Sequence, residues 1–78
     1  MTDDERKVID ALRTLLGQEL DITSATVLRD GLGLDSNALV EFTVLIYNMY
    51  RIDLGRRAAE RKVIPETVAE VAALLGAS

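Results

Sequence analysis

Apolar residues recur at spacings of three and four residues in separate segments of this 78-residue chain, and this spacing constrains the fold more than any other feature. Such spacings place apolar side chains on one face of an α-helix. No segment alternates apolar and polar residues for long enough to predict a strand. A chain this short buries only about 60% of its unfolded surface, so its core must be simple. We therefore expect a single all-α domain spanning residues 1–78.

The first and last predicted helices begin with the same local pattern. Thr2 is followed three residues later by Glu5, and Thr67 is followed at the same distance by Glu70. This is the pattern of a capping box, in which each side chain accepts a hydrogen bond from the other residue's backbone. Because proline is also common at the first helical position, a start at Pro65 is the alternative for the last helix. Thr67 is preferred because the apolar face follows it directly.

The pattern predicts a small helical bundle of three main helices and one short helix. A long connection separates the first two helices, which is typical of a bundle with one crossover loop. A connection of this length is uncommon in a compact domain and is often functional. The expected helices are 3–16, 36–50, 56–62 and 68–75, with connections at 18–35 and 51–55 and helix stops at Gly17 and Gly76.

The helix over 36–50 has two unlike faces when its residues are placed at about 100° per residue. The face expected to contact the core holds Ala38, Leu39, Phe42, Thr43, Leu45, Ile46, Met49 and Tyr50. The opposite face holds Asn37, Val40, Glu41, Val44, Tyr47 and Asn48. A solvated helix face normally carries several charges, whereas this second face carries one and is half apolar. It therefore indicates either a surface that meets another protein or a face that a short flanking helix covers.

Charge and composition exclude several classes of protein. The chain has 9 basic and 13 acidic residues, a net charge of −4, and no cysteine. Phosphate binding requires a basic face, so nucleic acid is not expected as a partner. No apolar segment approaches the roughly 20 residues that cross a bilayer, and the acidic N-terminus is unlike a secretory signal. We expect a free-standing cytoplasmic monomer that binds no membrane.

The chain also lacks the groups on which most enzymes depend. Histidine is absent as well as cysteine, so no base is evident that could activate a serine as a nucleophile. The acidic residues do not cluster at the spacings of metal ligands. We therefore expect neither catalysis nor a bound metal ion.

One short run carries the most specific functional information. Leu32-Gly33-Leu34-Asp35-Ser36 places a serine at the start of an apolar helix, directly after the long connection. Together with the capped first helix and the Thr67-Val68 start of the last one, this run closely resembles the attachment motif of acyl carrier proteins. The resemblance covers nearly the whole chain.

The resemblance implies that Ser36 carries a covalent 4′-phosphopantetheine arm, transferred from coenzyme A by a phosphopantetheinyl transferase. Acyl or aminoacyl groups would be held on this arm as thioesters and presented to loading and processing enzymes. Asp35 is well suited to cap the helix, and the resemblance further implies that it assists the metal-dependent transfer. A phosphodiester on Ser36 would lie near the unpaired backbone amides of the helix start. The residues expected to contact partner proteins are Leu34, Asn37, Val40, Glu41, Val44 and Tyr47.

Several positions depart from the family's usual pattern. Asn37 stands where leucine or methionine usually follows the serine, and Glu41 is the main acid left on this helix besides Asp35. The region of the third helix, usually acidic, is basic at Arg56, Arg57, Arg61 and Lys62. These departures favour a carrier dedicated to a specialised polyketide, fatty-acid-like or other natural-product pathway. An unmodified protein–protein interaction module with the same fold is the alternative.

Overall fold

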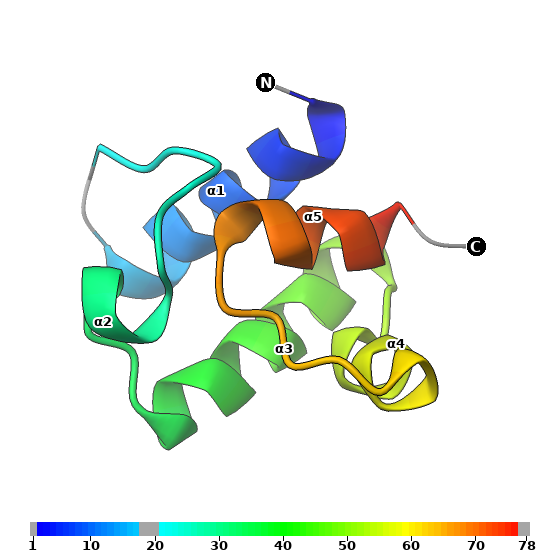
Figure 1. Ribbon diagram of the computed structural model, residues 1–78. Coiled ribbons are helices and arrows are strands. Elements are labelled where there is room, and N and C mark those ends of the chain that lie inside the picture. Colours follow the sequence, from blue (N-terminus) through cyan, green and yellow to red (C-terminus); the bar gives the residue numbers. More distant parts are fainter. Residues whose placement is uncertain (1, 18–20, 77–78) are drawn as a thin grey trace.

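Helices joined by loops make up the whole of the chain that the structure describes, with no strand in those ranges (Figure 1). The structure is a computed structural model that describes residues 2–17 and 21–76. In chain order the helices are α1 (Asp3–Leu16), α2 (Arg29–Leu32), α3 (Ser36–Tyr50), α4 (Leu54–Arg61) and α5 (Val68–Leu75). The all-α bundle predicted from the spacing of apolar residues is therefore confirmed.

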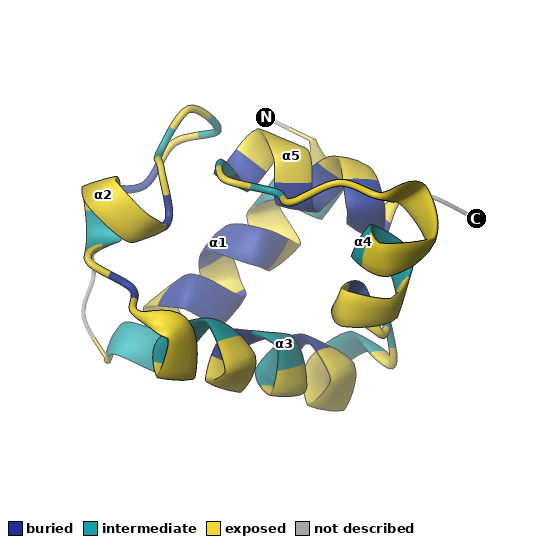
Figure 2. Cartoon of the chain, turned by 60° about the horizontal axis from the view of Figure 1, so that its bottom comes forward, coloured by how far each residue is buried: buried dark blue, intermediate teal, exposed yellow. Residues whose placement is uncertain are grey.

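A single hydrophobic core lies between α1, α3 and α5. Helix α1 packs against both α3 and α5, and α4 contacts the same two helices. Burial is concentrated on the inward faces, while α3 presents exposed residues along its outer edge (Figure 2). The largest fully buried side chains are Val8, Leu12, Phe42, Ile46, Val68 and Val71. Met49, which the helical wheel places on the core face of α3, is instead exposed, because it lies at the edge of that face near the end of the helix.

Both predicted capping boxes are present. The Thr2 hydroxyl accepts from the Glu5 N–H at 3.1 Å, and the Thr67 hydroxyl accepts from the Glu70 N–H at 3.2 Å. Each glutamate carboxylate accepts in return from the threonine N–H, at 3.0 Å in α1 and 3.1 Å in α5. Thr67, and not Pro65, is therefore the cap of α5. These reciprocal bonds satisfy amides that have no partner within the helix.

The long connection between α1 and α3 is anchored at several points along its length. Ile22 and Leu28 are buried in the core. The Leu28 N–H donates to the Glu66 carbonyl at 2.8 Å, and Val27 forms an isolated bridge with Thr67. The sequence pattern predicts this segment as connection throughout, but residues 29–32 form the single turn of α2. The connection is therefore a packed part of the fold.

Helix α4 begins two residues before its predicted start at Arg56. Asp53 caps it, because its carboxylate accepts from the Arg56 N–H at 3.0 Å. Leu54 then opens the helix and is buried, which ties α4 to the core. The segment 51–55, expected to be connection, is therefore partly helical.

Two of the basic residues of α4 make contacts within the protein. Arg56 pairs with Glu60 one helical turn later, with 2.9 Å between Nε and Oε1. Arg57 reaches α5, where its Nη1 donates to the carbonyls of Leu74 at 3.0 Å and Leu75 at 2.7 Å. A cation at a helix C-terminus satisfies carbonyls without intrahelical partners and complements the helix dipole. Part of this cluster therefore holds the fold together.

None of the helices in the described ranges combines the length and the apolar character needed to cross a membrane.

Candidate functional site

Helix α3 is capped by Asp35, so Ser36 is its first helical residue. The Asp35 backbone is extended, with φ −89° and ψ −177°, and its Oδ1 accepts from the Ala38 N–H at 2.8 Å. Asp35, and not Ser36, is therefore the cap of α3. The predicted capping function of Asp35 is confirmed, and the Ser36 hydroxyl is not needed for it.

The Ser36 side chain is exposed beside a cationic side chain. Its Oγ accepts a hydrogen bond from Nη2 of Arg29 at 3.2 Å. Arg29 is the first residue of α2 and lies seven positions earlier in the chain. A guanidinium is a donor only, so this partner cannot take the hydroxyl proton. The arrangement leaves the oxygen open to an incoming group and supplies a positive charge next to it.

The three residues before Asp35 have structural roles. Leu32 is partly buried against the core, Gly33 ends α2 with a left-handed φ of 71°, and Leu34 is 4% exposed. The Leu34 N–H also donates to the Leu28 carbonyl at 3.2 Å. Because Leu34 is buried, its predicted role as a partner contact is wrong, and it anchors the loop instead. Gly31, in contrast to Gly33, lies within α2 and its φ is not positive.

The outer face of α3 is open to solvent, which is one of the two alternatives that the sequence leaves open. Val40 is 61% exposed, Val44 53% and Tyr47 48%, and the flanking Asn37 and Glu41 are also exposed. The alternative in which a short helix covers this face is wrong, because no segment in residues 2–17 or 21–76 buries these side chains. We call Val40, Val44 and Tyr47 the apolar stripe.

Shallow hollows accompany the apolar stripe. One of about 410 Å³ lies between α3 and the last turn of α1, where Leu15 and Thr14 approach Val40 and Val44. At the other end, the Arg51 guanidinium lies over the Tyr47 ring at 5.6 Å from its centroid. The stripe therefore offers an apolar surface with a shallow recess at one end and a cation at the other.

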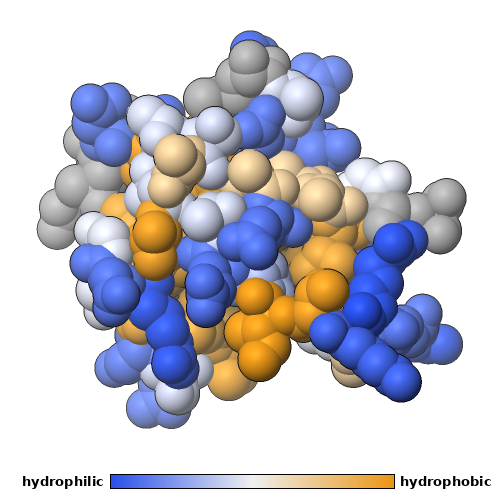
Figure 3. Space-filling model, in the orientation of Figure 1, coloured by the Kyte–Doolittle hydropathy of each residue, from blue (hydrophilic) through white to orange (hydrophobic). Residues whose placement is uncertain are grey.

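A groove of about 610 Å³ borders Arg29 and shares no lining residue with the apolar stripe. It runs between α2 and the segment joining α4 to α5, and Val27, Leu39 and Pro65 line it with Arg29. Ile64 lies at its edge and is 86% exposed. Hydrophobic surface is visible over the α4–α5 segment (Figure 3). The residue before Ile64, Val63, is also exposed, so two adjacent apolar side chains face solvent here.

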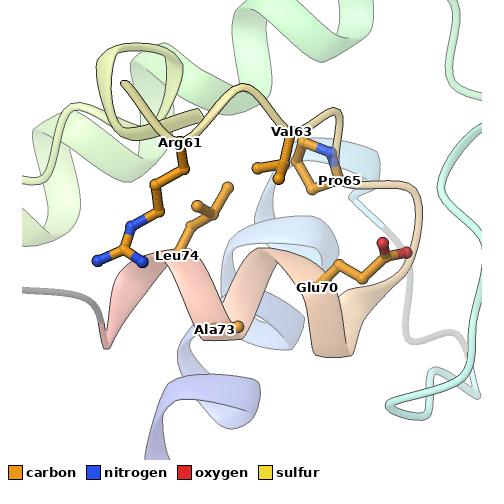
Figure 4. A pocket seen from close by; sticks show the side chains of 6 residues that line it. All are labelled: Arg61, Val63, Pro65, Glu70, Ala73 and Leu74. Atoms are coloured by element: carbon orange, nitrogen blue, oxygen red, sulfur yellow. The ribbon is translucent and has the colours of Figure 1, made fainter. Parts of the chain in front are cut away.

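A separate pocket of about 270 Å³ lies between the end of α4 and α5. Val63, Pro65 and Leu74 converge on it, with Arg61 and Glu70 at its margins (Figure 4). Glu70 already accepts hydrogen bonds in the capping box of α5. This pocket shares no lining residue with the helix start at Ser36, so we do not include it in the site.

Sequence reasoning missed Arg29 and Ile64. Neither belongs to a local motif, and each acquires its position from chain segments that are distant in sequence. The one sequence signal that could have marked the groove is an isoleucine directly before a proline, outside the predicted helices. In the described ranges, no group of three or more acidic side chains is placed to hold a metal ion.

Comparison of the chain with protein-family models, with curated proteins and with solved structures gives no match.

Proposed function

We propose that this chain is a carrier protein whose Ser36 bears a 4′-phosphopantetheine arm. One observation carries the proposal: in the run from Leu32 to Ser36, the serine hydroxyl is the functional group that the fold does not use. The leucines pack, Gly33 turns the chain and Asp35 caps α3. A serine that is exposed beside a cation, with its helix capped by a neighbour, is suited to modification.

The surroundings of Ser36 fit an anionic phosphodiester. Helix α3 has 15 residues, and its first amides lack intrahelical acceptors and carry the positive end of the helix dipole. The Arg29 guanidinium already donates to the oxygen that would bear the phosphorus. Helix starts of this kind favour negative charge. Ser36, the amides of the first turn and Arg29 are therefore the groups that would hold the phosphate.

Attachment requires a phosphopantetheinyl transferase and coenzyme A. The bond between Ser36 Oγ and phosphorus forms, the phosphorus–oxygen bond to the adenosine bisphosphate half of coenzyme A breaks, and the hydroxyl proton passes to the transferase. When bound, the arm supplies a thiol for carrying acyl or aminoacyl groups as thioesters. The groove beside Arg29 offers apolar surface to such a group, and the departures from the usual pattern favour a specialised biosynthetic pathway.

Intact-mass measurement tests the proposal directly. Incubation with coenzyme A and a broad-specificity transferase should add the mass of one phosphopantetheine. Ser36→Ala should remove the mass gain, whereas the matched control Ser24→Ala should retain it, because Ser24 lies outside the helix start. If several transferases leave the wild-type protein unmodified, or if Ser36→Ala still gains mass, the proposal is wrong.

The carboxylate of Asp35 has a proposed second role in the transfer reaction. Asparagine caps helices as well as aspartate does, so Asp35→Asn should leave α3 intact while removing the charge. We expect normal helix content by circular dichroism and a slower mass gain with the transferase. A mass gain at the wild-type rate would restrict Asp35 to capping.

The apolar stripe supports docking onto partner enzymes. Val44→Glu places a charge in its centre but should not disturb folding, because Val44 is about half exposed. Transfer of an acyl group to the cognate partner should slow markedly, and Ala69→Glu, which adds the same charge at an exposed position on α5, is a matched surface control. An unchanged transfer rate would exclude the stripe from the interface.

The second candidate is an interaction module in which Ser36 is never modified. Asn37 and the exposed stripe favour it, since both would serve a protein contact without an arm. In that case Val44→Glu weakens partner binding and Ser36→Ala has no effect. Neighbouring genes for ketosynthases, adenylation enzymes or transferases would favour the carrier.

A further inference from the structure

Arg29 and Ser36 are brought together by the packed loop between them. Leu28 and Leu34 are buried at the two ends of this segment, and the hydrogen bond between their backbones closes it at 3.2 Å. Gly33 reverses the chain with its left-handed φ of 71°. The guanidinium of Arg29 is thereby directed at the Ser36 hydroxyl, across the 3.2 Å hydrogen bond. This is a geometry that the fold holds in place, although both side chains are exposed.

The contact has little value for stability as it stands. A neutral hydroxyl engages one of the five N–H groups of a guanidinium, and an exposed bond of this kind contributes little to folding. The guanidinium has no ion-pair partner within 4.0 Å among the residues that the structure describes. An arginine in this position is suited to a phosphate oxygen, which it can bind with two parallel, charge-assisted hydrogen bonds.

We propose that Arg29 is a positioning residue that binds the phosphodiester on Ser36 and so fixes the first atoms of the arm against α2. This inference rests on the proposed function, because it requires the arm to be attached. The guanidinium moves from the hydroxyl to the non-bridging phosphate oxygens, which lie two bonds beyond Oγ. Since Arg29 also lines the groove of about 610 Å³, which shares no lining residue with the apolar stripe, the bound phosphate directs the arm toward that groove.

Side-chain NMR of the wild-type protein tests this without any catalytic assay. The Nε–Hε resonance of Arg29, assigned by its loss in apo Arg29→Gln, should shift on attachment of the arm, and rotation of the guanidinium should slow. Arg61, an exposed arginine on α4, serves as the matched control and should not respond. Raising the salt from about 0.1 M to about 1 M shortens the Debye length from roughly 10 Å to 3 Å and should move the Arg29 resonance back toward its apo position.

Variants provide a second, independent measurement on the phosphorus nucleus. The ³¹P resonance of the folded holo protein should differ from that of the same protein in urea. In holo Arg29→Gln it should move most of the way to the unfolded value, Arg29→Lys should be intermediate, and Arg61→Gln should match the wild type. If the Arg29 resonance is the same in the apo and holo forms, Arg29 does not hold the phosphate and the inference is wrong. Failure of the wild-type protein to accept the arm would instead contradict the proposed function.

Discussion

Helices α5 and α3 both begin next to a hydroxyl, but the two hydroxyls differ in what they do. Thr67 is itself the cap of α5: its Oγ1 accepts from the Glu70 N–H and donates to the Glu70 carboxylate, at 3.2 and 3.1 Å. Ser36 lies one residue further into its helix, where Asp35 has already provided the cap. The Thr67 hydroxyl is thus committed to the fold, and the Ser36 hydroxyl is available to another molecule.

This difference of one position separates a structural hydroxyl from a candidate attachment site. At the cap position a side-chain oxygen points back at the first-turn amides and is consumed by them. At the next position it points outward, while the helix dipole still favours negative charge around it. Helix α1 follows the pattern of α5, with Thr2 and Glu5 as its capping pair. Helix α4 is capped by an aspartate, as α3 is, but its first residue is the buried Leu54. Among these four helices, α3 is the one with a hydroxyl directly after its cap.

The largest effect is expected at Phe42, which tests whether α3 is held by the core and not by its first turn. Phe42 is 1% exposed, so Phe42→Ala should lower the free energy of unfolding by about 3–5 kcal/mol. Urea unfolding followed by circular dichroism measures this loss, with the exposed Val40→Ala as control. A loss smaller than that caused by removing the α5 cap would mean that the core does not fix the position of Ser36.

A smaller loss is expected at Thr67. Thr67→Ala removes the cap of α5 and should cost about 1–2 kcal/mol in the free energy of unfolding. Thr67→Ser keeps the hydroxyl and should recover most of this loss. The same urea titration measures both variants. If alanine is tolerated without loss, the Thr67 hydroxyl is not structural, and the contrast with Ser36 disappears.

Ser36→Ala should change the free energy of unfolding by no more than about 0.5 kcal/mol, because the hydrogen bond that Ser36 accepts from Arg29 joins two exposed side chains. The matched variant Asp35→Ala should cost about 1 kcal/mol, because it removes the cap itself. Thermal and urea unfolding of the pair test this order. A loss at Ser36 equal to that at Asp35 would assign the serine to the fold and weaken its candidacy for modification.

The smallest expected effect concerns the pKa of Glu5 and the stability of the protein at acidic pH. The Thr2 N–H, and then the Thr2 hydroxyl, hold the pKa of the Glu5 carboxyl below its ordinary value of 4.5. A folded-state pKa below the unfolded one contributes stability that is present above the unfolded value and lost as the pH falls through the folded pKa. NMR titration of Glu5 should therefore show the lowered pKa. Thr2→Pro removes both donors, whereas Thr2→Ala keeps the backbone N–H. The pKa of Glu5 should therefore rise further toward 4.5 in Thr2→Pro than in Thr2→Ala. The same pKa in both variants would exclude the backbone hydrogen bond as the main cause.

Much of the fold could be predicted because its determinants are local. The capping boxes at Thr2 and Thr67 join residues three positions apart, and apolar spacing identifies the inner face of α3 through Phe42 and Ile46. The early start of α4 at Asp53 was missed, although its determinant is also local. The place of Ser36 at a helix start could be predicted from the apolar spacing over 36–50 together with Asp35 as a capping residue.

The rest of the candidate site depends on long-range packing. Nothing in the sequence around Arg29 relates it to Ser36, and their contact exists because Leu28 and Leu34 are buried in a core built from α1, α3 and α5. The burial of Leu34 likewise depends on that core. Because Leu34 is buried, it is not part of the surface proposed to dock onto partner enzymes.

Most helix limits, the caps and the place of Ser36 at the start of α3 are thus determined by the local sequence. The hydrogen bonds within a helical turn join residues that are close together in the chain. The cation at the hydroxyl and the groove beside it required the folded bundle. They arise where segments far apart in sequence are held together by burial, and such burial is a property of the whole core.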